Sequence, residues 1–280
     1  MEQLAGRNAL VTGASGGIGA EIARRLAGRG MSLVLSGRRE DALARVAAEV
    51  GERGVRCLTL PADLADREQV KGLIEKAQSA LGPIDVLVNN AGIESVSSFT
   101  ASSEQDLAQT IEVNLTVPML LTHAVLPGML ERAQGHVVFI SSLAGKIGPA
   151  YNAPYAASKA GLVALTQSLR AEYMSSPVGF SVICPGFTAG EGMYQRMANE
   201  GHTSNRLVGE TSTGKVADAV VRAIREDVGE IVESGAPIRP MLALAQIAPG
   251  LVERVAPRFG VNEMFARVAS SRGRGDAGRA

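Results

Sequence analysis

The feature that most constrains the fold is an alternation of short apolar runs with longer helix-like stretches through the first 190 residues. The apolar runs are rich in Val, Ile and Leu without polar alternation, which is typical of strands buried on both faces; they span residues 9–11, 32–35, 55–60, 84–88, 136–140 and 178–183. The helix-like stretches cover residues 20–28, 40–50, 68–80 and 156–173. This order predicts an α/β fold whose parallel sheet is doubly wound, in three α/β/α layers. A further helix over 216–226 and a strand at 230–232 bring the sheet to about seven strands.

Composition and charge limit the classes of partner and compartment. The 280 residues are 46% hydrophobic, enough for a large core, and 28 basic residues balance 28 acidic ones. The charge balance gives no indication of a nucleic-acid partner. Cys57 and Cys184 lie far apart in apolar runs, which favours a reduced, cytoplasmic protein over a disulfide framework or a metal site. We also expect no signal peptide and no run of roughly 20 apolar residues that could span a bilayer.

The domain organisation changes near residue 235. We expect one domain over residues 1–235, a helical extension over 236–269 and a disordered Gly/Arg-rich tail over 270–280. Residues 236–280 hold seven arginines against three acids, and residues 240–252 are strongly apolar. Such a segment can cover a lipophilic pocket, pack on a partner subunit or lie on a membrane surface. We expect a dimer interface or a pocket lid, with peripheral membrane contact as the alternative.

The stretch TGASGGIG, residues 12–19, holds four glycines between the first predicted strand and the first helix. Glycines at such a turn permit positive φ and a close approach of backbone N–H groups to a pyrophosphate. The helix N-terminus adds a favourable dipole for an anion. A plain tight turn is the alternative in a chain with 32 glycines. Four glycines at the end of the first strand favour a phosphate-binding loop.

The spacing of these glycines is T-G-x-x-x-G-x-G, carried by Thr12, Gly13, Gly17 and Gly19. Further motifs follow in order at the ends of later strands: Asp63-Leu64, Asn89-Asn90-Ala91-Gly92, Asn114, Ser141-Ser142, Tyr155-x-x-x-Lys159 and Pro185-Gly186. Open α/β sheets bind ligands at that edge. Over roughly residues 5–190 the chain resembles the short-chain dehydrogenase/reductase family. The resemblance implies a Rossmann-type fold and hydride transfer with a nicotinamide cofactor.

The spacing of Tyr155 and Lys159 places both side chains on one helical face. A lysine ammonium beside a phenol lowers the phenol's pKa, so that it can exchange a proton with a carbonyl or alcohol oxygen near neutral pH. The resemblance implies that Tyr155 is the general acid/base and that Lys159 also holds the nicotinamide ribose. It implies that Ser142, rather than Ser141, hydrogen-bonds the reacting oxygen. Asn114 would anchor a water relay to Lys159; its alternative role is to cap or bend a helix.

The end of the second strand indicates which nicotinamide cofactor binds. An acidic residue there would bind the ribose hydroxyl of NAD, but the chain reads Arg38-Arg39. A guanidinium fits a ribose phosphate, which favours NADP over NAD; otherwise the arginines only start a solvated helix. The family usually has threonine at the position of Gly190, so we expect Thr188 or the backbone near Phe187 to replace that contact. The predicted cofactor-binding residues are Gly13, Ser15, Gly16, Gly17, Ile18, Gly19, Arg38, Arg39, Asp63, Leu64, Asn90, Ala91, Gly92, Tyr155, Lys159, Pro185, Gly186 and Thr188.

The substrate pocket implied by the resemblance follows Gly92, Ser142 and Gly186. Its predicted lining is mostly apolar, although each of these side chains can equally be packing: Leu143, Ile147, Tyr151, Phe187, Met193, Tyr194 and Met197. A hydrophobic ketone, aldehyde or secondary alcohol fits such a lining better than a sugar or a charged acid. We therefore predict an NADP(H)-dependent oxidoreductase, as a homodimer or homotetramer. A non-catalytic NADP-binding sensor and a family epimerase or dehydratase are the alternatives.

Overall fold

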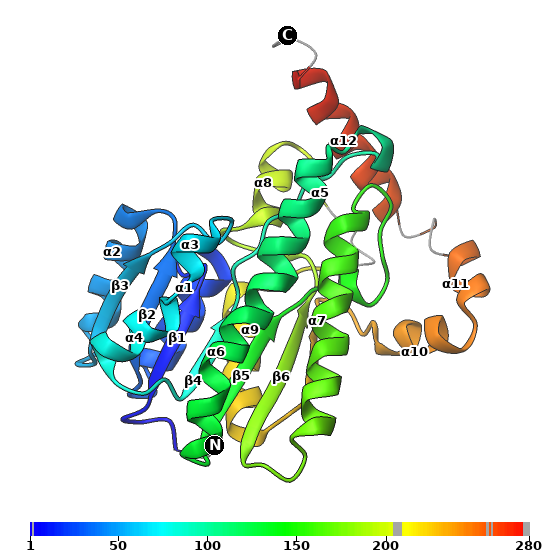
Figure 1. Cartoon of the computed structure of the whole chain (residues 1–280). Coiled ribbons are helices and arrows are strands. Elements are labelled where there is room, and N and C mark those ends of the chain that lie inside the picture. Colours follow the sequence, from blue (N-terminus) through cyan, green and yellow to red (C-terminus); the bar gives the residue numbers. More distant parts are fainter. Residues whose placement is uncertain (2, 204–208, 256–257, 259, 277–280) are drawn as a thin grey trace.

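A parallel sheet of seven strands forms the centre of the protein, in the order β3-β2-β1-β4-β5-β6-β9 (Figure 1). The computed structural model describes residues 1, 3–203, 209–255, 258 and 260–276. The strands are β1 Asn8–Thr12, β2 Ser32–Gly37, β3 Cys57–Pro61, β4 Val86–Asn89, β5 Gly135–Ile140, β6 Val178–Pro185 and β9 Glu230–Glu233. This strand order reverses between β1 and β4, as in doubly wound nucleotide-binding sheets. The predicted fold class is confirmed.

Six helices cover the two faces of the sheet: α1 Gly17–Ala27, α2 Glu40–Gly51 and α9 Thr213–Glu226 on one, and α4 Leu73–Leu81, α6 Val117–Glu131 and α7 Ala153–Glu172 on the other. Each face has its own apolar core. Leu26 and Ile224 are fully buried on the first, and Leu121 and Leu162 nearly so on the second. Strands β4, β5 and β6 are buried along their whole length, which explains their continuous apolar sequence.

The expected helix over residues 68–80 is divided into two in the structure. Helix α3 covers Arg67–Val70, and α4 begins at Leu73. Gly72 between them has a φ of 73°, a left-handed conformation that does not continue a helix. The prediction of one helix is therefore wrong, because the extended backbone of Lys71 ends α3 and the left-handed Gly72 then starts α4.

A long apolar helical stretch precedes β5. It consists of α5 (Glu104–Ile111), a π-helical turn (Glu112–Thr116) and α6. From the sequence we expect no run long and apolar enough to span a membrane. Among the described residues one helix, Glu104–Glu131, meets that test by length and composition. Half of its most apolar window is buried within the protein. Its apolar side chains include Val125 and Met129, which are fully buried in the core between the sheet and helices α4, α6 and α7.

Three helices follow the last strand: α10 (Arg239–Ile247), α11 (Pro249–Val255) and α12 (Val261–Asp276) (Figure 1). The remaining elements are short: η1 Phe99–Ala101, η3 Leu143–Gly145, β7 Thr188–Ala189, α8 Met193–Asn199 and β8 Thr211–Ser212. Helix α12 packs on α8 through Met264, Phe265 and Val268. It continues to Asp276, so the tail predicted to be disordered from residue 270 is helical over its first part; residues 277–280 lie outside the described chain.

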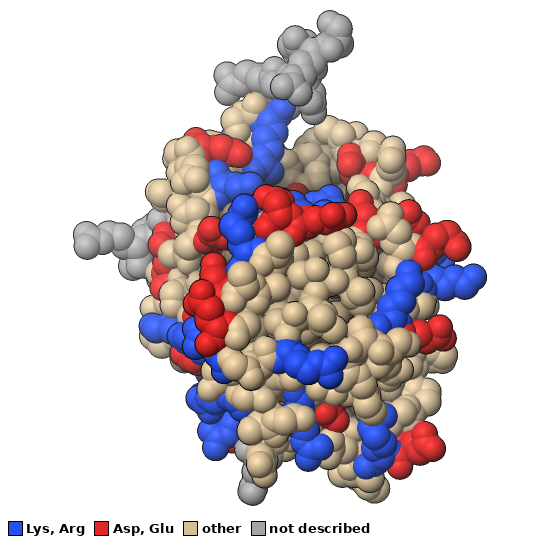
Figure 2. Space-filling model, turned by 90° about the vertical axis from the view of Figure 1, so that its left-hand side faces the viewer, with Lys and Arg blue, Asp and Glu red and all other residues tan. Residues whose placement is uncertain are grey.

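Charged side chains of both signs are interspersed on the face shown in Figure 2. Some of them pair between neighbouring helices, as Arg24 of α1 does with Glu49 of α2 at 2.7 Å. Such exposed pairs contribute little to stability, roughly 0–1 kcal/mol each. The mixed surface is in keeping with the zero formal net charge of the whole chain.

Candidate active site

The glycine loop joins β1 to α1 at the edge of the sheet where the strands end. Gly13 and Gly17 have φ angles of 66° and 56°, which disfavour any other residue. A Cβ atom on Gly19 would collide with the carbonyl oxygen of Gly13, so the first helical turn packs directly on the loop backbone. The loop is thus a cradle of bare backbone at a helix N-terminus, which is the geometry that binds phosphate groups.

Thr12 and Asn90 hold this loop against β4. The Thr12 hydroxyl accepts hydrogen bonds from the backbone N–H groups of Asn90 and Ala91, at 3.0 and 3.1 Å. The Asn90 side-chain amide donates to the carbonyl oxygens of Thr12 and Gly13, at 2.9 and 3.2 Å. The motif residues at the ends of β1 and β4 therefore form one hydrogen-bonded clasp, named here the Thr12–Asn90 clasp.

Two arginines lie at the end of β2, beside the glycine loop. Arg39 donates from Nη2 to the carbonyl oxygen of Ser15 at 2.9 Å, while Arg38 is exposed and lines the same cavity. The first acid after them, Glu40, is not among the lining residues. The cavity continues past Asp63, whose carboxylate accepts from the Ala65 N–H at 3.0 Å. All eighteen residues predicted to bind the cofactor line this one cavity, whose volume is about 1120 Å³.

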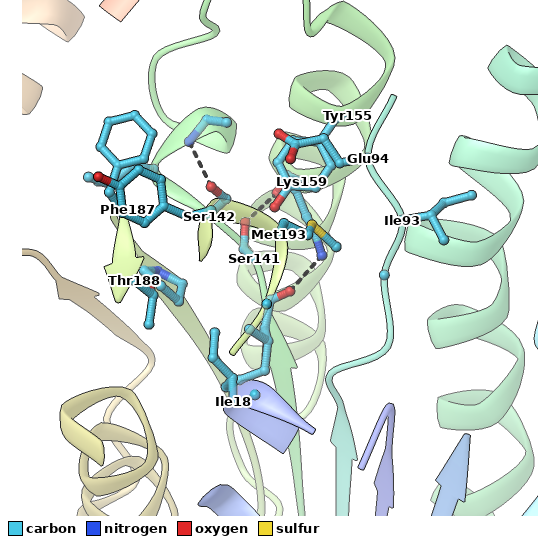
Figure 3. A pocket seen from close by; sticks show the side chains of 18 of the residues that line it. Ile18, Ile93, Glu94, Ser141, Ser142, Tyr155, Lys159, Phe187, Thr188 and Met193 are labelled. Carbon is cyan, nitrogen blue, oxygen red and sulfur yellow. Dashed lines mark hydrogen bonds between the residues drawn. The ribbon is translucent and has the colours of Figure 1, made fainter. Parts of the chain in front are cut away.

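Three of the four predicted catalytic side chains, Ser142, Tyr155 and Lys159, lie together in the cavity (Figure 3). Lys159 is 3% exposed, and its Nζ donates to the Ile140 carbonyl oxygen at 2.9 Å and lies 5.5 Å from the centre of the Tyr155 ring. The Ser142 hydroxyl acts on Tyr155, whose pKa it lowers, and it caps the turn η3 by accepting from the Ala144 N–H at 3.1 Å. Ser141 instead donates to the Lys159 carbonyl oxygen at 2.7 Å. Ser142 is therefore the serine that faces the tyrosine, and Ser141 anchors α7 to β5.

The electrostatics of Tyr155 differ from the expectation. Burial raises the pKa of Tyr155, the negative charge of Glu94 raises it further, and the Ser142 hydrogen bond lowers it. The pKa of Lys159 is itself lowered to about 8 by burial. The net shift of the Tyr155 pKa in the protein alone is therefore upward, opposite to the lowering expected from Lys159, because burial is its largest cause.

Asn114 lies behind the cavity wall rather than on it. It is fully buried in the π-helical turn, and its side chain bonds both backbone groups of Ile93, at 2.8 and 2.9 Å, and the Ser158 hydroxyl at 3.1 Å. A Cβ on Gly92 would lie 3.3 Å from both the Asn114 Oδ1 and the Lys159 Nζ. The Asn114 side-chain oxygen and the Lys159 ammonium group therefore both lie next to Gly92. A π-turn at this point is in keeping with a functional position.

Of the predicted substrate residues, all but one line the cavity: Leu143, Ile147, Phe187, Met193, Tyr194 and Met197. Tyr151 does not; it is 40% exposed and absent from the lining. The backbone at Tyr151 has a φ of 63°, and this reversal buries the next residue, Asn152, in the cavity wall instead. The prediction for Tyr151 is thus wrong by one position.

The end of β6 and the chain that follows it form a further part of the cavity wall. Pro185, Gly186 and Thr188 line it, and the Thr188 hydroxyl donates to the Gly186 carbonyl oxygen at 3.0 Å. Gly190, where the family usually has threonine, has a φ of 111°. The carboxylate of Glu191 then accepts from the N–H of Gly17 in the glycine loop, at 3.3 Å.

Sequence reasoning missed several lining residues, of which Glu94, Asn152 and Glu191 carry polar groups into the cavity. A charged residue two positions after Asn90-Ala91-Gly92 is a visible signal for Glu94, and Asn152 directly before Ala-Pro is a helix-start signal. The lining supplied by α10 and α12, which includes Met241, Val261 and Phe265, belongs to the C-terminal segment whose expected roles included a pocket lid, although no single residue of it was predicted. Within the described chain there is no group of three or more His, Cys, Asp or Glu side chains suited to a metal ion.

Comparison with known proteins gives consistent matches. Residues 7–201 match the family model described as short chain dehydrogenase. The chain is 38% identical to "Ketoacyl reductase HetN" of Nostoc sp. over 97% of this chain and 96% of that protein, a match that takes in most of the C-terminal helices. It is 40% identical to "Oxidoreductase UcpA" of Salmonella typhimurium over 67% of this chain and 71% of that protein. A crystal structure of a metagenomic short-chain oxidoreductase in complex with NADP superposes with a TM-score of 0.70, at 32% identity over 83% of this chain and 98% of that one.

Proposed function

Because the chain belongs to the short-chain dehydrogenase/reductase family of NAD(P)-dependent oxidoreductases, we propose that it reduces a lipophilic ketone or aldehyde with NADPH, using Tyr155 as the proton donor. The observation that carries the proposal is the meeting of Ser142, Tyr155 and Lys159 in the same cavity as the glycine loop. The family acts on small carbonyl and alcohol compounds, and the apolar side chains of Phe187, Met193 and others favour a lipophilic one.

The residues of the cavity fit a dinucleotide. The glycines of the loop present bare backbone, at which a diphosphate can replace the Glu191 carboxylate on the Gly17 N–H, and Asp63 and Asn90 border the adenosine end of the cavity. Arg38 and Arg39 favour NADP, because a guanidinium binds a ribose phosphate with two hydrogen bonds. Lys159 and Thr188 border the nicotinamide end. When bound, the reduced nicotinamide supplies the hydride.

The chain's own residues then handle the carbonyl oxygen and the proton. The Ser142 hydroxyl holds the oxygen next to the phenol of Tyr155. Tyr155 donates its Oη proton to that oxygen as the carbon is reduced, so the product is a neutral alcohol and Tyr155 is left as a phenolate. With its pKa raised above the ordinary value, the phenol of Tyr155 is protonated at neutral pH, as a proton donor must be. The buried ammonium of Lys159 stabilises the phenolate until a proton returns.

The test is NADPH oxidation by the purified protein with a panel of hydrophobic ketones, aldehydes and quinones. We expect turnover with NADPH, weak turnover with NADH, and loss of turnover in Tyr155→Phe. A double variant, Arg38→Ala with Arg39→Ala, should weaken NADPH binding by at least about tenfold and leave NADH binding nearly unchanged. Equal turnover in Tyr155→Phe would contradict the mechanism. Cofactor retained through purification without net oxidation would instead support an epimerase or dehydratase, and binding without any turnover a sensor.

A further inference from the structure

We propose that Glu94 and Asn152 form a polar subsite beside Tyr155, which binds a hydroxyl group that the substrate carries close to its reacting carbonyl. The subsite deepens the proposed function and rests on it, since it specifies which lipophilic carbonyl compounds the enzyme prefers. Neither residue belongs to the motifs that identify the family in this chain.

The two side chains come from different elements and meet in the cavity. Glu94 follows the end of β4, and Asn152 directly precedes α7, the helix that carries Tyr155 and Lys159. The Asn152 amide donates from Nδ2 to the Glu94 Oε1 at 2.5 Å, and both residues line the cavity with Tyr155. Figure 3 shows Glu94 next to Tyr155, and its charge acts directly on the phenol. The carboxyl group is therefore within the space that a bound carbonyl compound would occupy.

The pair is not fully satisfied by the protein itself. Asn152 is completely buried, and its Oδ1 has no hydrogen-bond partner within the described chain. Among the described residues Asn152 is the only hydrogen-bond donor to Glu94, whose side chain lines the cavity. Buried polar groups in proteins are nearly always paired, and the exceptions call for a functional explanation. A substrate hydroxyl bound between the two side chains can donate to the Asn152 Oδ1 or to Glu94, and so supplies one.

The backbone next to the subsite is strained in a way that places Asn152. Tyr151 has a φ of 63°, which is rare for a residue other than glycine, asparagine or aspartate. Its carbonyl oxygen accepts from the Ser97 N–H at 3.0 Å, which ties this turn to the segment after Glu94. Strain of this kind persists where the surrounding structure enforces it, and it concentrates at binding sites. The fold thus holds Asn152 and Glu94 together.

The charges around Glu94 select a neutral substituent. Three cations act on it: Lys159 from α7, Arg196 from α8 and Arg272 from α12. They disfavour an ammonium group on the substrate, while Glu94 itself disfavours a carboxylate. A hydroxyl both donates and accepts, so it can bond the Glu94 carboxyl in either protonation state. Burial raises the pKa of Glu94, so both states are accessible closer to neutral pH than for an ordinary carboxyl.

The subsite is tested by binding of two alcohols to the NADPH-loaded protein, with which they cannot react, measured by isothermal titration calorimetry. The probes are α-methylbenzyl alcohol and styrene glycol, which differ by one hydroxyl group. We expect the wild type to bind the glycol about tenfold more tightly, the usual gain from a hydrogen bond to a carboxyl group. Glu94→Leu should remove the preference and keep the affinity for α-methylbenzyl alcohol. Glu94→Gln, which keeps hydrogen-bonding capacity and volume, should retain part of it. Glu104→Leu, an exposed control, should behave as the wild type.

Equal binding of the two alcohols by the wild type, or a preference that survives in Glu94→Leu, would overturn the subsite. Thermal melts of each variant show whether it is folded; if Glu94→Leu is not, the comparison of wild type with Glu94→Gln decides. Turnover of acetophenone and of phenacyl alcohol with NADPH is followed in parallel, with the hydroxylated ketone expected to have a kcat/KM about tenfold higher. Preference for the glycol without turnover of either ketone would contradict the proposed reductase activity and leave the subsite standing.

Discussion

Lys159 carries an amine inside the protein, and its burial disfavours the charged ammonium form. Its amine has a pKa near 10.5 in the unfolded chain and about 8 in the folded protein, because burial disfavours the ammonium form. Below pH 8 the folded state therefore bears the whole cost of a buried ammonium, about 3 kcal/mol by proton linkage. The cost decreases as pH rises from 8 to 10.5, so this group makes the protein more stable with rising pH in that window.

Replacing Lys159 with methionine should therefore separate stability from activity. We expect Lys159→Met to raise the free energy of unfolding at neutral pH by about 1–3 kcal/mol, reduced somewhat by the lost hydrogen bond to Ile140, and to abolish turnover. Urea denaturation at several pH values measures the gain, which should shrink toward pH 10.5. The exposed Lys76→Met serves as the control and should change neither quantity. A destabilised Lys159→Met at neutral pH would contradict this account.

Single residues show where prediction from sequence succeeds and fails. Tyr155 and Lys159 could be placed because their spacing within one helix sets their relative positions. Asn152 could not, because its direction depends on the one unusual φ angle at Tyr151. Glu94 acquires its role only through contact with a residue 58 positions away in sequence. Its effect on the pKa of Tyr155 is a property of the folded cavity.

Among the elements, the glycine loop is the most sensitive to substitution. We expect Gly19→Ala to weaken NADPH binding by at least about tenfold, because its Cβ would collide with the Gly13 carbonyl and displace the loop from β1. Fluorescence titration of NADPH measures the loss. Gly51→Ala, at the end of α2 with open space around its Cβ, is the matched control and should bind normally. Normal binding by Gly19→Ala would show that this close packing is not needed for cofactor binding.

The segment from β7 to α8 places Glu191 on the anion-binding end of α1. Its carboxylate accepts from the Gly17 N–H at 3.3 Å, the position suited to a phosphate oxygen. Glu191→Gln should tighten NADPH binding by about threefold to tenfold, because it removes a negative charge that competes with and repels the cofactor phosphates. Fluorescence titration at low and high salt measures the change, which salt should reduce. The exposed Glu52→Gln is the control; weaker binding by Glu191→Gln would assign Glu191 an attractive role.

Apolar runs in the sequence could predict all seven strands of the main sheet: the inner strands leave continuous runs because they are buried, and the partly exposed edge strands β3 and β9 keep shorter ones. They could not predict the division of α3 from α4, since glycine is compatible with both a helical and a left-handed backbone and the apolar pattern does not distinguish them. The short pair β7 and β8 escaped prediction for a similar reason: each has two residues, too few for a periodic signal.

At the scale of the whole molecule, α12 joins the end of the chain to the substrate side of the cavity. Phe265 is 4% exposed, packs near Phe187 with ring centres 6.5 Å apart, and lines the cavity. Phe265→Ala should raise the KM for bulky ketones by about tenfold with a smaller change in kcat, because it removes an apolar wall remote from the reacting groups. Initial-rate kinetics measure this. Leu251→Ala, at a half-exposed position of α11, is the control. A fall in kcat alone would contradict a purely binding role.

The sequence is compatible with three roles for the C-terminal segment, because an apolar helix with arginines suits a pocket lid, a subunit interface or a membrane surface. The structure places α12 over the cavity, which favours the lid for that helix. On α10 and α11, Leu244, Ile247 and Leu251 stay exposed. Their packing on a second subunit or on a membrane remains a prediction, since composition alone cannot distinguish the two.

The Thr12–Asn90 clasp has a consequence for the speed of cofactor capture. Because four hydrogen bonds hold the glycine loop in shape before any ligand arrives, the loss of backbone freedom at this loop accompanies folding and not binding. A dinucleotide then meets a rigid receptor, and its association requires no slow rearrangement of the loop. Affinity at this end of the cavity is accordingly governed by how fast the ligand leaves.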